Sequence, residues 1–308
     1  LIQIDYFCFY EKPYLKLDRL INTYFTFSPK GSSSFYEAAK SWIKNKFHQK
    51  RIIIQNLERL GLKKDIKERL LFSEHHLSHA ASAFFPSPFK TSVILTMDGV
   101  GEYATSSLGI GDENTLFIDK EIHFPHSLGL LYSAFTYHCG FKVNSGEYKL
   151  MGLAPYGEPI YKKRILDNLI DVKEDGSFML NMEYFDYCTG FKMINEKFCT
   201  LFDIKKRHES NKILNKNMNL ASSIQSVTED IVLKITKEAF KNYSISKLCL
   251  AGGVALNCVA NGKILKEKIF KNIWVQPAAG DAGGALGSAL FTYYHILKHE
   301  KRRVKKND

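Results

Sequence analysis

The sequence predicts a globular α/β fold. Short runs rich in β-branched and aromatic residues alternate with longer amphipathic segments along most of the 308 residues. One strand-like run ends in Asp-Gly and another in Gly-Gly, which is typical of strands that lead into a turn or into the start of a helix. A hydrophobic share of 45% with 13% aromatic residues provides for a sizeable core, and the length allows one large domain or two of ordinary size.

The first part of the chain predicts a mostly helical, basic segment between two strands. We expect a strand over 2–10, helices over 15–27, 34–47 and 51–62, and a short strand over 69–72.

Three of the ten histidines follow within five residues, in the sequence HHLSH that starts at His75. His75 and His79 are four residues apart, so on a helix they point from one face. Two imidazoles at this spacing can share a divalent metal with a carboxylate from elsewhere in the chain. A helix with structural or surface histidines explains the same pattern, because this spacing alone is only moderately specific.

Asp98 directly follows the next predicted strand. Strands are expected over 91–97, 104–110 and 117–124, and the first two form a hairpin around Asp98 and Gly99. Asp98 is therefore either a turn residue or a carboxylate that faces a metal or a phosphate beside a glycine backbone.

The middle of the chain predicts helices and one small hairpin. A helix that opens at Pro125 offers free backbone N–H groups to an anion, although most such starts are ordinary caps. The glycines of 146–157 indicate tight backbone approach. Further helices are expected over 162–170, 193–202 and 217–243, and a hairpin over 171–184.

Two glycine-rich turns close the fold. The strand over 247–250 ends at Gly252 and Gly253 before a helix, which indicates a nucleotide seat or simply a tight strand-to-helix crossing. The strand over 273–276 leads to Asp281, which is either the N-cap of a final helix to Lys298 or the carboxylate partner of His75 and His79. Small residues after Asp281 leave room for a neighbouring element or a ligand.

Composition excludes several classes of protein. The net charge is +11, but neither a recognition motif nor interleaved aromatic residues accompany the basic clusters, so nucleic-acid binding is not expected. No apolar run is long enough for a membrane span. Six scattered cysteines without a CxxC pair predict reduced thiols and a cytoplasmic protein.

Six segments, taken in order, resemble the O-carbamoyltransferase family that includes nodulation and antibiotic-tailoring enzymes. They are HHLSHAASAFFPSPF, LTMDGVGEYATS, FPHSLGLLYSAFTYHCGF, GEYKLMGLAPYG, LAGGVALNCVANG and PAAGDAGGALGSAL. The resemblance implies an actin-like, sugar-kinase-like fold of two lobes, shared with the tRNA threonylcarbamoyl transferases. Residues 1–90 are then the remainder of the first lobe with a helical insertion, 91–298 the second lobe, and 299–308 a basic tail.

The resemblance also implies a metal and a nucleotide. Iron(II) is the expected metal, and Asp98 is also the expected catalytic residue. Metal ligands are expected at His75, His79, Asp98 and Asp281. Nucleotide-binding residues are expected at Asp98, Gly129, Gly252, Gly253 and Asn257.

The implied reaction moves a carbamoyl group from carbamoyl adenylate to a hydroxyl of a small, sugar-containing acceptor, and AMP leaves. In the family a separate domain makes carbamoyl adenylate from ATP and carbamoyl phosphate. No segment here resembles that domain or the family's first hairpin, so both are expected outside this chain, in cis or in trans. Residues 171–192 are expected near the acceptor. The alternatives are threonylcarbamoyl transfer to tRNA, phosphotransfer, or an inactive fragment that binds metal and nucleotide.

Overall fold

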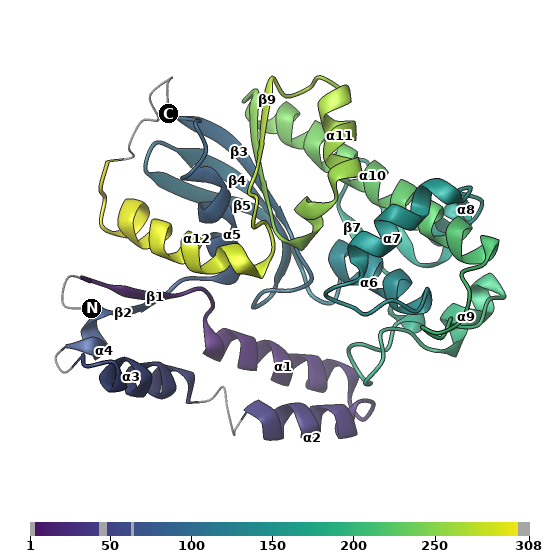
Figure 1. Ribbon diagram of the computed structural model, residues 1–308, viewed down its shortest axis with the longest axis horizontal. Helices are drawn as coiled ribbons and strands as arrows, with labels where there is room; N and C mark the ends of the chain where they lie inside the picture. Colours follow the sequence, from purple (N-terminus) through teal and green to yellow (C-terminus); the bar gives the residue numbers. More distant parts are fainter. Residues whose placement is uncertain (1–3, 43–47, 63–64, 301–308) are drawn as a thin grey trace.

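The computed structural model describes residues 4–42, 48–62 and 65–300, and its centre is a five-stranded sheet (Figure 1). The strands lie in the order β5-β4-β3-β8-β9. β3 is antiparallel to β4 and parallel to β8, so the sheet is mixed. The bounds are β3 (Thr91–Met97), β4 (Ala104–Asp112), β5 (Thr115–His123), β8 (Lys247–Ala251) and β9 (Asn272–Val275). The predicted α/β class and the hairpin at Asp98 are confirmed.

Both faces of this sheet are covered. Successive side chains of a strand point to opposite faces, and in β3 Val93 and Leu95 belong to one buried cluster while Ile94 belongs to the other. The first cluster includes residues of α6 (Leu128–His138) and α10 (Asn215–Tyr243). The second includes residues of α5 (His75–Phe84) and of the π-helix η6 (Phe291–Ile296). α5 therefore packs against the sheet, and this packing sets the position of α5 beside the end of β3.

A helical segment precedes α5, as predicted. It contains α1 (Pro13–Phe27), α2 (Ser32–Ser41), α3 (Gln49–Arg59) and α4 (Ile66–Arg69). Two short parallel strands, β1 (Phe7–Phe9) and β2 (Leu70–Phe72), bracket it. β1 is shorter than the expected strand over 2–10. Residues 1–3 and 43–47, at the ends of two predicted elements, lie outside the described residues.

The remaining elements lie on the α6 and α10 side or follow β8 (Figure 1). The bounds are α7 (Glu147–Leu153), η2 (Ala154–Tyr156), α8 (Lys162–Asn168), β6 (Ile170–Val172), β7 (Phe178–Leu180), η3 (Met182–Tyr184), α9 (Glu196–Phe202), η4 (Gly253–Leu256), α11 (Cys258–Lys266), η5 (Asp281–Gly283) and α12 (Gly284–Leu290). β6 and β7 form the expected antiparallel hairpin.

Two expectations need correction. The glycine-rich stretch 146–157 contains a helix, α7, that was not predicted, and close approach occurs only at some of its glycines. A Cβ at Gly157 would lie 2.2 Å from the backbone of Met218, whereas Gly152 has no atom within 4 Å of such a Cβ. The final helix is present from Asp281 to Ile296, but it is not a uniform α-helix, because η5, α12 and η6 are consecutive segments of different helical type.

α10 is the longest helix of the described residues, and an apolar stripe along it is buried. Ile224, Val227 and Ile231 are each at most 1% exposed, so this stripe belongs to the core. Among the described helices, none is both long and apolar enough to cross a lipid bilayer.

Candidate metal centre

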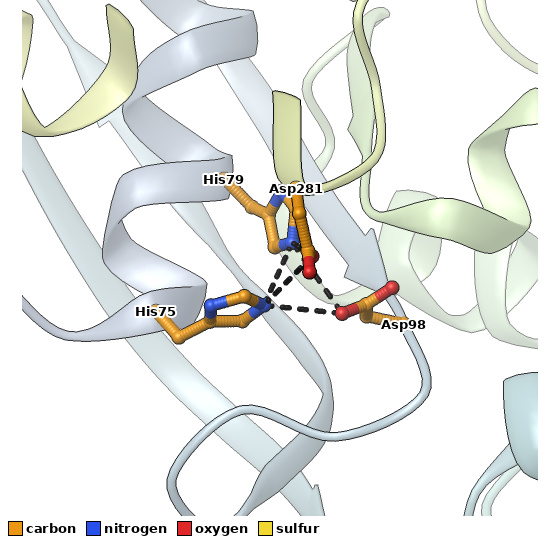
Figure 2. A group of neighbouring side chains, drawn as sticks. All are labelled: His75, His79, Asp98 and Asp281. Carbon is orange, nitrogen blue, oxygen red and sulfur yellow. Dashed lines mark hydrogen bonds and ion pairs between the residues drawn. The ribbon is translucent and has the colours of Figure 1, made fainter. Parts of the chain in front are cut away.

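Four side chains from three separate parts of the chain converge at one point (Figure 2). His75 and His79 come from α5, Asp98 from the turn after β3, and Asp281 from the first residue of η5. One ligand atom from each lies within 4.8 Å of the others. The structure thus brings together all four residues that the sequence suggested as metal ligands, and the metal itself stays a prediction.

The two imidazoles meet because α5 presents both from one face. The Nε2 atoms of His75 and His79 are 3.1 Å apart, and the residues are 3% and 1% exposed. The third histidine of the motif, His76, points elsewhere. Its Nδ1 lies 2.7 Å from the hydroxyl of Thr96 in β3. Burial, helped by the positive charges of His79 and His75, lowers the pKa of His76 to about 3, so it is a neutral anchor of α5 on the sheet.

Asp98 spans the space between the histidines and the turn after β8. Its Oδ2 lies 3.1 Å from Nε2 of His75 and 3.5 Å from Nε2 of His79. Its Oδ1 accepts the backbone N–H of Gly253 at 2.9 Å. Asp98 is therefore more than a turn residue, because both carboxylate oxygens are engaged by distant segments.

Asp281 closes the group from the other side. Its Oδ1 lies 3.5 Å from Nε2 of His75 and 3.8 Å from Nε2 of His79. The N-cap of η5 is Gly280 and Asp281 is the first residue of that helix, so the N-cap explanation of Asp281 is wrong. The side chain is 67% exposed, which makes Asp281 the solvent-facing member of the four.

The charges of the group favour a bound cation. Burial alone would raise the pKa of Asp98, but hydrogen bonds and charge from His75 and His79 outweigh it and hold that pKa well below its usual value. Burial lowers the pKa of His75, yet the hydrogen bond and charge of Asp98, with Asp281 and Glu102, raise it overall. Two carboxylates facing two buried imidazoles therefore attract positive charge, from protons or from a metal.

The spacing also fits a metal. Nitrogen and oxygen ligands about 2.0–2.2 Å from one ion lie roughly 3 to 3.6 Å from each other. Four of the five separations given above, between 3.1 and 3.5 Å, fall in this range. The Nδ1 atoms of His75 and His79 are buried and have no hydrogen-bond partner among the described residues, so the Nε2 atoms are the ring nitrogens that face the shared point. The residues present fit a divalent cation held by two imidazoles and one or two carboxylates.

Three of the predicted nucleotide-binding glycines pack around Asp98. A Cβ at Gly129 would lie 2.6 Å from the carbonyl oxygen of Asp98, and one at Gly253 would lie 2.9 Å from its Oδ1. Gly252 has φ +87, and its Cβ would lie 2.2 Å from the oxygen of Met97. At these positions the backbone approaches the turn that bears Asp98 so closely that only glycine fits.

Asn257 is less open to a ligand. Its side-chain amide pairs with Gln225 through two hydrogen bonds of 2.9 and 3.0 Å, and its Oδ1 also accepts the N–H of Ala260 at the start of α11. These contacts explain Asn257 as a helix cap, and its contact with a nucleotide stays a prediction.

Two residues that shape the site, Gly101 and Glu102, were not singled out from the sequence. The carboxylate of Glu102 accepts the backbone N–H of His75 at 3.0 and 3.2 Å. A Cβ at Gly101 would lie 3.0 Å from Cβ of His75, so the loop touches α5 directly. Both residues act across the fold on a helix that precedes them, a relationship that local patterns do not encode.

Comparison with known proteins extends these observations. The family described as "Carbamoyltransferase N-terminus" matches residues 1–290. Uncharacterized protein sll1178 of Synechocystis sp. is 56% identical over 310 residues, which cover 99% of this chain and 50% of that protein. Nodulation protein NolNO of Sinorhizobium fredii is 37% identical over 224 residues, which cover 72% of this chain and 31% of that protein.

A solved structure, HypF of T. kodakarensis, covers 80% of this chain and 39% of its own at 12% identity, with a TM-score of 0.43. The chain thus spans half or less of the length of each of these proteins.

Proposed function

The chain belongs to the carbamoyltransferase family, and we propose that it is the domain that transfers a carbamoyl group from carbamoyl adenylate to a hydroxyl of a small, sugar-containing acceptor. The observation that carries this proposal is the convergence of His75, His79, Asp98 and Asp281 beside the glycine turns at 129 and 252–253. Four potential cation ligands and three glycines with closely packed backbone lie together there, which supports binding of a nucleotide-linked substrate.

The proposed reaction is an acyl transfer. The acceptor oxygen forms a bond to the carbamoyl carbon, the bond from that carbon to the phosphate oxygen breaks, AMP takes the electron pair, and the hydroxyl proton is lost to solvent. A bound divalent metal, for which we propose iron(II), supplies a Lewis acid that polarises the mixed anhydride and orients it.

The residues of this chain have distinct parts in the proposal. His75 and His79 hold the cation through Nε2, and Asp98 and Asp281 hold it through one oxygen each. With a cation bound, its positive charge favours the ionised carboxylate, so Asp98 is a charged ligand rather than a proton acceptor. The glycines at 129, 252 and 253 let the backbone pack closely against Met97 and Asp98, and we propose that the adenylate binds beside this turn. Residues 171–192 remain our proposed location for acceptor contacts.

Metal analysis and a transfer assay test the proposal together. The purified chain is supplied with carbamoyl adenylate and a panel of sugars, and release of AMP is measured together with the mass of the acceptor. We expect acceptor-dependent AMP release and acceptor that is heavier by one carbamoyl group. A metal-loaded protein that releases AMP equally without any acceptor, or that transfers only to tRNA, would contradict the proposed acceptor class.

We also expect no release of pyrophosphate when the chain receives ATP and carbamoyl phosphate in place of carbamoyl adenylate. This expectation separates the transfer step from the activation step that we assign to another domain. Sustained pyrophosphate release by this chain alone would contradict that division.

A further inference from the structure

We propose that Glu102 is a positioning residue for the metal centre. Its buried carboxylate fixes the first turn of α5 against the loop that bears Asp98, so that His75, His79 and Asp98 keep their mutual geometry. The inference rests on the proposed function, because it assigns Glu102 a part in the same metal site.

Glu102 replaces the cap that α5 lacks. The helix begins at His75, and the side chain of the N-cap residue Glu74 makes no capping hydrogen bond. The first N–H groups of a helix need acceptors from outside the helix. Both carboxylate oxygens of Glu102, which lies 27 residues further along the chain, accept the N–H of His75. A distant carboxylate thus satisfies the helix start at the residue that carries the first imidazole.

The same carboxylate joins a third segment to the site. Glu102 accepts the backbone N–H of Lys12 at 2.7 Å, directly after the segment that contains β1. Glu102 is only 6% exposed, and no Lys, Arg or His partner lies within ion-pair distance of it among the described residues. Backbone N–H groups, the positive end of the α5 dipole and the charge of the nearby Arg19 guanidinium together balance this buried charge.

The loop between Asp98 and Glu102 is held at both ends. Asp98 faces the imidazoles, Glu102 holds the helix start, and between them Arg19 donates to the carbonyl oxygen of Gly101 at 2.7 Å. Gly101 is in contact with His75, since a Cβ there would lie 3.0 Å from Cβ of that residue. Without the Glu102 carboxylate, the first turn of α5 and the Asp98 loop lose the contact that sets their separation. Metal affinity depends on such outer contacts, because ligands must be oriented before the ion binds.

A helix cap with only a structural role would affect folding and leave the metal affinity of the folded protein unchanged. Metal affinity therefore distinguishes a structural cap from a positioning residue. The experiment compares Glu102→Gln, Glu102→Asp and the control Glu121→Gln. Glu121 lines the same cavity as Glu102, but its carboxylate pairs with His123 and not with α5. The metal-free proteins are titrated with cobalt(II), whose visible absorption reports binding, and thermal melting of each metal-free protein is measured in parallel.

We expect Glu102→Gln to weaken cobalt binding at least about 10-fold, as removal of outer contacts to metal ligands commonly does. Glu102→Asp should recover part of the affinity, because it keeps the charge, and Glu121→Gln should match the wild type. Equal affinity of folded Glu102→Gln and wild type would overturn the positioning role and leave the proposed function intact. A wild type that binds no cobalt would overturn both.

If Glu102→Gln fails to fold, Glu102→Asp decides the question. A folded Glu102→Asp protein with weaker cobalt binding supports the positioning role, and one with wild-type affinity overturns it.

Discussion

Gly287 of α12 lies directly against the carbonyl oxygen of Ser78 in α5. A Cβ atom added at Gly287 would come within 1.8 Å of that oxygen. α5 carries both imidazoles, and α12 follows Asp281, so this contact brings the late carboxylate next to the early histidines. The expectation that small residues after Asp281 leave room for a neighbouring element is confirmed, and the neighbour is α5.

We predict that Gly287→Ala destabilises the protein and weakens metal binding together. The added methyl group overlaps backbone rather than a flexible side chain, so α12 must move away from α5, and overpacking of this kind typically costs about 1–3 kcal/mol. Urea unfolding gives the free energy, and cobalt titration gives the affinity. Unchanged affinity in a destabilised Gly287→Ala protein would show that the two helices do not set the ligand geometry.

Gly152→Ala is the matched control. Gly152 lies in helix α7, and a Cβ there meets no atom within 4 Å. Since alanine is favoured over glycine within a helix, we expect a gain of about 0.5–1 kcal/mol in the free energy of unfolding. Metal affinity should not change. A loss of stability would mean that Gly152 has a packing role that the structure does not show.

We predict that Asp281→Ala and His75→Ala both lose metal but differ in stability. The Asp281 side chain is 67% exposed, whereas the His75 side chain is 4% exposed. Removing an exposed group away from packing contacts usually changes stability by no more than about 0.5 kcal/mol, so metal-free Asp281→Ala should melt close to the wild type. Elemental analysis of wild type and both variants measures the metal content. The same trace metal content in all three proteins would refute the ligand assignment.

We predict that Gly252→Ala reduces folding stability. Gly252 has φ +87, where an L residue is strained, and its Cβ would lie 2.2 Å from the oxygen of Met97. The expected cost is at least about 1 kcal/mol.

Gly253 has no such φ, and its Cβ would meet only Oδ1 of Asp98 at 2.9 Å. Gly253→Ala should therefore keep most of the stability while weakening metal and AMP binding, measured by calorimetry. If both variants lose stability but bind metal and AMP as tightly as the wild type does, the turn has a role in folding only.

His138 should make stability depend on pH. Burial lowers its pKa in the folded state, with a smaller contribution from Lys206, and its Nδ1 is buried without a partner. The unfolded chain therefore takes up a proton on this residue at higher pH than the folded protein does. The stability that neutral His138 contributes is fully present above its ordinary pKa of about 6.5 and is lost as the pH falls below that value.

The variant His138→Gln isolates this effect, because a glutamine can still donate to the carbonyl of Ile204 but cannot ionise. We expect the urea midpoint to decrease from neutral to mildly acidic pH. The decrease should be larger for the wild type than for the variant. Parallel decreases would show that other groups, such as His126, control the acid sensitivity.

Much of the fold follows from local patterns. The strands around Asp98 and the helix that bears His75 and His79 were predicted because side chains repeat every two residues in a strand and every three to four in a helix. Local patterns were incomplete at 146–157, where the glycines indicated tight backbone approach and the short helix α7 was not predicted. There, packing against α6 and α10 outweighs the weak helix propensity of glycine.

The sequence by itself determined which side chains are available for the centre, since spacing placed two imidazoles on one helical face and put Asp98 and Asp281 after strands. It left each acid with two explanations, a turn or cap residue and a ligand. Only the tertiary structure placed both acids beside the imidazoles, because the distance from Asp281 to the imidazoles depends on the packing of α12 against α5. The same holds for Glu102, whose hydrogen bond to His75 exists only once the sheet has brought the loop and the helix together.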